Sequence, residues 1–496
     1  MIVRLRPTLM LGCALGALCA AARADAQAFN ADPTTSAGTV SYDRGTPGVE
    51  TIFIDSPTAI INWVPNVSGN PIIFLPSGNT ATFTNGSVVN DFVVLNRIFA
   101  NAPVRFDGHV ISQLQNLALG TSDIGGTVIF SSPTGIIVGP TAVFDVGNLV
   151  LTSLGVVDDG AGNFYDPAAQ QLQFQLGGMQ PSFVITMAGA QINALNEGSY
   201  VAMIAPQLVH GGAVRVNGSA AYVAGEAVTM RVNQGLFDII VDTGTDRVTP
   251  IIHTGSTTGP ASTGAGDNHG IFLVAMPKNQ AITAILQGNA GFDAAVDAAI
   301  ENGVVVLSAG FNVAGGAVDR FGDFSPGPVP GIAASFEIRG GTITSDLFGY
   351  AVTDMLASGM ATGNLAFSQD VSLFAGARAH LFAGAGQNVT VGGNVLVSAA
   401  QTRSADPTLF DFTGGEALIF TQGGTLAITG NAFIDAEAIG RVDTGNSRAG
   451  NGTGGTAGLF ANGGSITVGG NLAVRASGTG ATIDFAPDQG GTGTGG

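Results

Sequence analysis

Few side chains in this sequence have the type and spacing that catalysis or metal binding requires. The sequence holds no H-E-x-x-H zinc motif, no G-x-S-x-G nucleophile elbow and no phosphate-binding P-loop, and its five histidines are scattered: His109, His210, His253, His269 and His380. Asp293 and Asp297 would share one face of a helix over residues 292–302, but no third carboxylate follows at a fixed spacing, so a solvated helix face is the better interpretation. Residues 264–267 have the composition of one calcium-binding glycine repeat, and such sites need stacked copies. We therefore expect no catalytic residue, cofactor or metal.

The charge balance narrows the possible partners. The formal net charge of the 496-residue chain is −18. Without residues 1–26, which hold three arginines and one aspartate, 14 basic residues (17 − 3) face 34 acidic ones (35 − 1), a charge of −20. Nucleic acid and anionic lipid are poor partners for such a chain. A β-helical polysaccharide lyase or hydrolase would need clustered carboxylates with a basic residue on one face, and Lys278 is the only lysine, so this enzyme alternative is disfavoured.

The backbone that must position these residues is built from very short strands. Within residues 128–154, apolar runs at 128–130, 136–138, 142–146 and 149–152 are separated by corners that contain Gly or Pro. Strands this short do not suit a sandwich hairpin, but they suit the rungs of a parallel β-helix. The 75 glycines, in a chain that is 45% hydrophobic, fit many tight corners between buried strands and argue against disorder.

Four landmarks occur in a specific order in the first 140 residues. They are A-I-I-N-W at 59–63, V-V-L-N-R-I at 93–98, G-H-V-I at 108–111 and S-P-T-G-I at 132–136. This series resembles the filamentous-haemagglutinin N-terminal domain, the secretion domain of two-partner-secretion exoproteins. Ser132 and Thr134 depart from the family, which usually has Asn at these places, so hydroxyls must replace the amide hydrogen bonds of that turn or these are lost.

The resemblance implies a fold, a route and a set of residues. It implies a right-handed, single-stranded parallel β-helix with an N-terminal cap and extra-helical strands. It also implies an adhesin-like exoprotein of a Gram-negative bacterium, secreted or held at the cell surface, whose partner is an outer-membrane barrel transporter with periplasmic domains; surface glycans or proteins of a host cell are candidate ligands. The secretion-motif residues carried over are Ile61, Asn62, Trp63, Asn96, Arg97, Ser132, Pro133, Thr134, Gly135 and Ile136. The simpler interpretations are that Trp63 is a core aromatic and that Arg97 is a surface charge or the partner of a neighbouring loop.

The chain divides into five segments. Residues 1–26 have basic residues, an apolar core too short to span a bilayer and an A-D-A end, which indicates a secretory signal peptide. Both cysteines lie in this signal, so a disulfide cannot lock the mature chain. Residues 27–50 are expected to be a loose lead-in, 51–230 the secretion domain, with a loop or extra-helical excursion over 158–180, and 231–330 a β-helix with a loop and the short helical insertion.

Residues 331–496 contain an internal repeat. Gly-Asn corners at Asn394, Asn431 and Asn471 are spaced by 37 (431 − 394) and 40 (471 − 431) residues, and apolar residues alternate on both sides of each corner. This is a solenoid signature, and the spacing predicts about two coils per repeat. An asparagine at such a corner can hydrogen-bond exposed backbone groups and stack on its equivalents.

Two expectations concern the whole product. The Gly/Thr-rich run after the last repeat does not close a coil, so we expect these residues to be part of a longer shaft. The alternatives to a two-partner exoprotein are an autotransporter-type passenger and the polysaccharide-acting enzyme discussed above.

Overall fold

The chain forms an elongated stack of β-strand coils. A computed structural model describes residues 27–116, 119–160, 162–177, 182–233, 236–263, 269–294, 303–315, 331–358, 364–401, 410–443, 448–481 and 492–496. The predicted signal peptide and the glycine repeat at 264–267 lie outside these residues. Of the predicted helix, Phe292 is the last residue of a strand, Asn289–Phe292, and 295–302 lie outside the described residues. The described part contains no helix long and apolar enough to cross a membrane.

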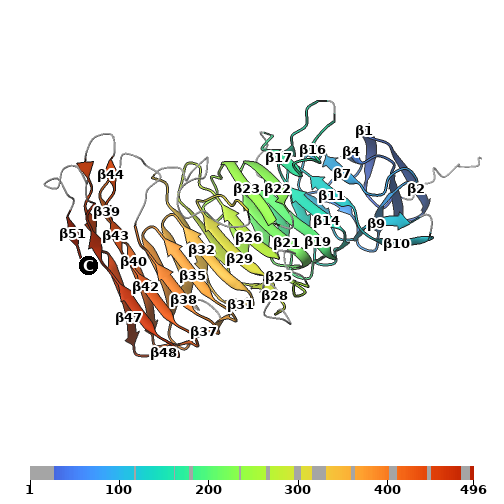
Figure 1. Cartoon of the computed structure of the whole chain (residues 1–496). Helices are drawn as coiled ribbons and strands as arrows, with labels where there is room; N and C mark the ends of the chain where they lie inside the picture. The colour runs from blue at the N-terminus through green and yellow to red at the C-terminus, as the bar shows by residue number, and fades with distance from the viewer. Residues whose placement is uncertain are drawn as a thin grey trace, which may run out of the picture.

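Two long sheets make the coil (Figure 1). Sheet A has 27 strands in the described part: β1 (Ala31–Ala37), β2 (Val40–Thr46), β3 (Val49–Ile54), β4 (Thr58–Pro65), β6 (Thr80–Asn85), β7 (Val93–Ile98), β9 (His109–Asn116), β10 (Thr121–Ile124), β11 (Thr127–Ser131), β13 (Val143–Asp145), β14 (Asn148–Thr152), β19 (Gln191–Ala205), β21 (Ala213–Ala224), β25 (Ser256–Gly259), β26 (Gly270–Ala275), β28 (Asn289–Phe292), β29 (Val304–Ala309), β31 (Gly341–Ile343), β32 (Asp346–Ala351), β34 (Leu365–Phe367), β35 (Val371–Ala375), β37 (Asn388–Val391), β38 (Val395–Ser398), β41 (Thr425–Ile428), β42 (Ala432–Asp435), β48 (Ser465–Val468) and β49 (Leu472–Arg475). Sheet B has 12 strands there: β5 (Ile72–Leu75), β8 (Val104–Phe106), β12 (Ile136–Val138), β18 (Val184–Thr186), β20 (Leu208–His210), β24 (Ile251–His253), β27 (Ile282–Leu286), β30 (Ala334–Ile338), β33 (Asp354–Ser358), β36 (Arg378–Ala383), β40 (Glu416–Gln422) and β47 (Thr456–Asn462). Very short strands lie near the C-terminal end: β39 (Phe412–Thr413), β43 (Ala438–Ile439), β44 (Val442–Asp443), β45 (Arg448–Ala449), β46 (Gly452–Thr453), β50 (Gly478–Thr479) and β51 (Gly493–Thr494).

Side chains alternate between the interior of the coil and its outside. In β12, for example, Ile136 and Val138 are fully buried while Ile137 between them is partly exposed. Because successive coils pair in parallel and in register, each inward position forms a column through the molecule, and one continuous apolar core results. The predicted parallel β-helix with an N-terminal cap and extra-helical strands is confirmed.

The N-terminal cap is made by residues that we expected to be a loose lead-in, and this expectation is wrong. β1 pairs antiparallel with β4, and β2 pairs antiparallel with β3. Phe29 is buried, and its ring centroid lies 4.9 Å from that of Trp63 and 4.8 Å from that of Phe74. The buried carboxylate of Glu50 accepts hydrogen bonds from the backbone N–H of Ala28 (3.2 Å) and from the Arg44 guanidinium (2.6 Å), which anchors the segment. The polar composition of residues 27–50 concealed this role, since the segment contributes only a few apolar residues, chiefly Phe29, to the core.

A third sheet lies outside the coil, as the excursion over 158–180 suggested. Sheet C consists of β15 (Gly155–Val156), β16 (Tyr165–Asp166), β17 (Gln171–Gln175), β22 (Ala227–Asn233) and β23 (Leu236–Thr243), and all its pairings are antiparallel (Figure 1). Its apolar face covers outward-facing side chains of sheet A and forms a second core. The coil strand β21 ends at Ala224, and the next strand, β22, belongs to sheet C.

The C-terminal repeat is one coil long, so the expectation of about two coils is wrong. β37 pairs directly with β41, and β41 with β48, so that Val389, Leu426 and Ile466 follow one another in a column. The preceding coils are shorter, since Leu365 pairs with Val389, 24 residues on (389 − 365). The later coils reach 37 and 40 residues because each adds chain between β38 and β40 or between β42 and β47.

Candidate functional site

The landmark residues stack in three neighbouring rungs. β4, β7 and β11 pair in parallel, which aligns Ile61 with Asn96 and Asn96 with Phe130. The same register aligns Asn62 with Arg97 and Arg97 with Ser131, directly before the predicted turn. Segments that are some 35 residues apart in the sequence (96 − 61) therefore form one contiguous patch close to the N-terminal cap.

Trp63 and Asn96 form a polar contact inside the coil. Both side chains are fully buried, and Trp63 Nε1–H donates to Asn96 Oδ1 at 3.0 Å. Asn96 Nδ2 donates in turn to the Ile129 carbonyl at 3.2 Å, so it ties β7 to β11. Asn62, one residue before Trp63, is only partly buried, and its side-chain oxygen has no hydrogen-bond partner in the described part of the chain. The two motif asparagines thus differ: the fold uses the side chain of Asn96 and leaves the oxygen of Asn62 unpaired.

The turn at 132–136 is held by the coils on both sides. The Gly135 N–H donates to the Ser132 carbonyl at 2.9 Å, which closes the turn. Thr134 Oγ1 donates to the Ala102 carbonyl (2.8 Å) in the preceding coil, and Ser132 N–H donates to the Thr152 carbonyl (3.0 Å) in the next. The Ser132 and Thr134 hydroxyls lie 3.3 Å apart, so hydroxyls do supply bonds at this turn.

Gly135 is the one position of this turn that requires glycine. Its φ is +115°, which side chains with a Cβ rarely adopt, and a Cβ built there would lie 3.1 Å from the ring of Phe183. Ile136 follows inward and is buried, while its N–H donates to the Phe183 carbonyl at 3.0 Å. The turn therefore sets the entry into β12 and its register in sheet B.

Arg97 is the hydrogen-bonding partner of a neighbouring loop. Its guanidinium donates to the Val156 carbonyl at 3.2 Å and forms an ion pair with Asp158. The Arg97 hydrogen bond, together with the Gly160 N–H, holds the pKa of Asp158 below its usual value. The two contacts link the landmark strand β7 to β15 of sheet C and to the loop that follows it.

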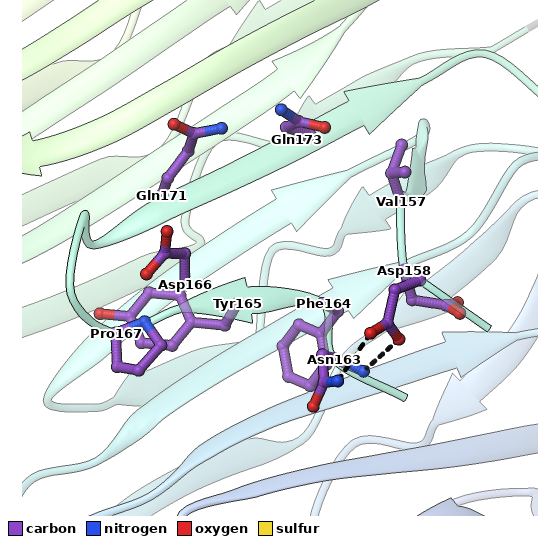
Figure 2. Close-up of a pocket in the computed structure, with 10 residues that line it drawn as sticks. Val157, Asp158, Asn163, Phe164, Tyr165, Asp166, Pro167, Gln171 and Gln173 are labelled. Carbon is purple, nitrogen blue, oxygen red and sulfur yellow. Dashed lines mark hydrogen bonds between the residues drawn. The ribbon is translucent and has the colours of Figure 1, made fainter. Parts of the chain in front are cut away.

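Asp158 also lines a shallow pocket at the edge of sheet C. Figure 2 shows its lining, which is Val157, Asp158, Asp159, Asn163, Phe164, Tyr165, Asp166, Pro167, Gln171 and Gln173. The carboxylates serve the loop itself, since Asp159 accepts from the Asn163 amide (2.6 Å) and Asp166 accepts from the Ala168 N–H (2.9 Å). No group of three or more possible metal ligands occurs among the described residues.

The histidines are less scattered than the sequence suggested. His210 and His253 occupy adjacent rungs of sheet B, with ring centroids 4.6 Å apart, and both are buried in the coil. His210 Nδ1 contacts Thr186 Oγ1 at 2.5 Å, His253 Nε2 contacts Thr257 Oγ1 at 2.8 Å, and the same Thr257 hydroxyl contacts the Tyr222 hydroxyl at 2.6 Å. Burial lowers the pKa of His210 to about 4, and burial together with the nearby His210 lowers the pKa of His253. Each histidine is the last residue of a short apolar strand, and only the coil register brings them together.

The Gly-Asn corners form a ladder on the outside of the coil. Asn394 Oδ1 accepts the Asn431 N–H at 2.9 Å, and Asn431 Oδ1 accepts the Asn471 N–H at 2.8 Å. The ladder begins earlier than the sequence repeat, because Asp370 Oδ1 accepts the Asn394 N–H (2.7 Å) and Asp346 Oδ1 accepts the Asp370 N–H (3.1 Å). Sequence reasoning missed the two aspartates since it searched for a recurring Asn.

Solved structures similar to this chain include two secretion domains. One is the HMW1 secretion domain from Haemophilus influenzae, at 15% identity and a TM-score of 0.46, covering 89% of this chain and 99% of that one. The other is the filamentous hemagglutinin secretion domain, at 16% identity and a TM-score of 0.32, covering 68% of this chain and 99% of that one. No protein-family model and no curated protein matches the sequence.

Proposed function

We propose that the chain is a two-partner-secretion exoprotein with an adhesin-like shaft. Its N-terminal domain directs export through an outer-membrane barrel transporter with periplasmic domains, to the cell surface or the medium of a Gram-negative bacterium. The observation that carries the proposal is that the landmarks on β4 and β7, far apart in sequence, pair in register next to the cap and align with β11, directly before the turn at 132–136, while the landmark on β9 pairs with β6 and β13 of the neighbouring coils. The cap belongs to this domain, so we extend its proposed start from residue 51 to residue 27, with the shaft proper over 231–496.

The transporter would meet the landmark segments before they fold. An extended, apolar segment such as residues 128–154, whose one charged residue is Asp145, can add to a sheet edge through its backbone, which leaves the side chains of the turn free to be recognised. Folding outside the cell then buries the same segments in the coil and makes their return unfavourable.

The test separates export from folding. Three variants are made in the native bacterium: a triple alanine at Pro133, Thr134 and Gly135; Asn62→Ala; and, as control, Thr390→Ala at an exposed outward position of β37. The first two are expected to accumulate in the periplasm, and the control to reach the medium or surface like the wild type. Because the fold leaves the Asn62 oxygen unpaired, purified Asn62→Ala should melt within a few degrees of the wild type. Export of the first two variants at the control level would overturn the proposal.

A further inference from the structure

The outer face of sheet B carries an apolar stripe that crosses five successive coils. Parallel pairing aligns the middle residues of β12, β18, β20, β24 and the fourth residue of β27 into one column: Ile137, Ile185, Val209, Ile252 and Ile285. The first four are partly exposed and belong to neither of the two buried cores. β-Branched residues favour strands, but an unbroken exterior column of them exceeds what strand propensity needs.

The molecule covers its other exterior stripe. On sheet A the outward residues Ile60, Leu95, Ile129, Val150 and Ala202 form a comparable column, and each is at most 2% exposed because sheet C packs over them. No element of the described residues joins the sheet B stripe to a core in this way. The two stripes have similar compositions, but among the described residues only the sheet A stripe is covered by another element.

The same face continues with aromatic side chains toward the C-terminal end. Phe382 and Phe420 stack with centroids 4.8 Å apart, and Phe460 follows them in register with 53% of its surface exposed. Leu356 in β33 and Leu418 in β40, the strands on either side of the Phe382 strand β36, occupy the adjacent outward column. Phe382 and Phe420 are partly exposed, and aromatic side chains that reach the surface in a row are typical of contact surfaces.

The charges on this face are nearly balanced, unlike those of the whole chain. Arg105 pairs with Asp107 (2.8 Å), Arg339 with Glu337 (2.7 Å), Arg378 with Asp354 (2.6 Å), and His380 lies 2.7 Å from Glu416. Three arginines thus oppose four carboxylates here, whereas 14 basic residues oppose 34 acidic ones over residues 27–496. Two copies of this acidic protein repel each other through their net charge, and the near balance of charges on this face makes that repulsion small here.

We propose that the outer face of sheet B is the interface between two copies of this chain. A second copy is the partner whose strand spacing of about 4.8 Å matches every rung of the stripe, and a two-fold interface between copies is the commonest form of assembly. Twelve strands at this spacing make a face about 50 Å long and about 15 Å wide, or about 750 Å², close to the roughly 800 Å² that each partner buries in a stable complex.

Sedimentation of the secreted chain between about 1 and 100 µM tests the proposal, and we expect a dimer whose dissociation constant falls in that range. Ile252→Asp, which places a carboxylate in the stripe, should raise the dissociation constant at least about tenfold. Thr390→Asp, at an exposed outward position of sheet A, is the matched control and should change it less than about threefold. Melting curves of both variants establish that each is folded.

A cross-linking arm does not depend on weakening the dimer. The mature chain has no cysteine, since Cys13 and Cys19 lie in residues 1–26, so single cysteines can be introduced. Counted from β47 as the first, β24 is the seventh of the twelve strands and so lies near the middle of sheet B. In a two-fold dimer a residue at the middle of the shared face lies opposite the same residue of the other copy, whether the two coils run parallel or antiparallel. Ile252→Cys should therefore cross-link to dimer with a short bis-maleimide, and Thr390→Cys should not. A wild-type chain that stays monomeric at 100 µM, or a dimer that Ile252→Asp leaves intact, would overturn the proposal.

Discussion

The Trp63–Asn96 contact shows how much a single polar side chain can matter inside this coil. The buried amide of Asn96 satisfies the indole N–H of Trp63 while binding the Ile129 carbonyl. In an apolar interior an unmade hydrogen bond costs more than a made one contributes, because the buried group has lost its water.

The first prediction follows from that asymmetry. Asn96→Leu should lower the free energy of unfolding by about 1 to 3 kcal/mol, because it leaves the Trp63 N–H without an acceptor. Asn96→Leu combined with Trp63→Phe should cost less than the sum of the two single changes, since the second change removes the orphaned donor. Chemical denaturation of the four proteins measures the coupling, and strict additivity would contradict the contact.

The second prediction concerns the stacked histidines. The pKa of His210 is about 4 in the folded chain against 6.5 when unfolded, so the unfolded state binds the proton more readily. Stability is therefore unaffected above pH 6.5, falls as the pH drops from 6.5 toward 4, and levels off below. Between pH 7.5 and 5 this histidine alone should remove about 2 kcal/mol, and His253 shifts in the same direction.

Comparison with His253→Leu separates the histidine contribution to the pH dependence of stability from the contribution of the carboxylates. In His253→Leu a leucine continues the column in which Leu286 already occupies the next rung. Its loss of unfolding free energy between pH 7.5 and 5, measured by denaturant titration, should be smaller than that of the wild type. An equal loss in both proteins would show that folding does not lower the pKa of His253.

At the scale of elements, the corner ladder transmits hydrogen bonds from coil to coil. Asp346, Asp370, Asn394, Asn431 and Asn471 each accept or donate along one edge of sheet A. All three asparagines are exposed, so water can replace a lost partner, and each bond contributes about 0.5 to 1.5 kcal/mol.

The third prediction ranks positions within the ladder. Asn431 accepts the Asn471 N–H and also donates through Nδ2 to Asn394 (3.0 Å), whereas Asn471 donates its backbone N–H to Asn431, a bond that does not need the Asn471 side chain. Asn431→Leu should therefore lower the unfolding free energy by about 1 kcal/mol, and Asn471→Leu by clearly less. Thermal melts of both variants measure this. Equal effects would mean that the side-chain hydrogen bonds of Asn431 to both neighbouring rungs do not contribute to stability.

Sequence reasoning predicted the elements whose pattern is local. The short strands between Gly or Pro corners, the inward alternation and the order of the landmark strands β4, β7 and β12 were all visible as residue types at fixed spacing. It failed where an element depends on a distant partner. β1 reads ADPTTSA and becomes a strand because β4 offers it an edge, and β22 leaves the coil because β17 and β23 pair with it.

Coil length and the histidine pair were hidden for a related reason. Whether 37 residues make one coil or two depends on how much chain leaves the helix, and apolar periodicity does not report an excursion. His210 and His253 are 43 residues apart (253 − 210), and only the register of sheet B makes them neighbours. Of the candidate site, the residues were identifiable from the sequence, and their contacts were not.

At the scale of the whole molecule, stability passes from one coil to the next. Each coil contacts mainly its two neighbours, so a solenoid behaves approximately as a one-dimensional chain of coupled units. The N-terminal end is closed by the cap, where Phe29 fills the space between Trp63, Phe74, Phe83 and Phe130. The cap and the C-terminal coils lie at opposite ends of the stack (Figure 1), so we expect the cap to protect the coils beside it more than those far along the shaft.

The last prediction tests this gradient. Phe29→Ala removes the plug and should lower the local opening free energy of β3 to β8 by about 3 to 5 kcal/mol, because a buried aromatic leaves a cavity that the surrounding rings fill only in part. The strands β40, β41 and β42 lie many coils away and should keep their protection, since coupling between repeats weakens with distance. Hydrogen exchange followed by peptide mass measures both regions in one experiment, and Asn431→Leu serves as the mirror-image control, with its loss confined to the C-terminal coils. Equal loss of protection at both ends in Phe29→Ala would mean that the shaft opens as one cooperative unit, so that the cap stabilises the entire coil.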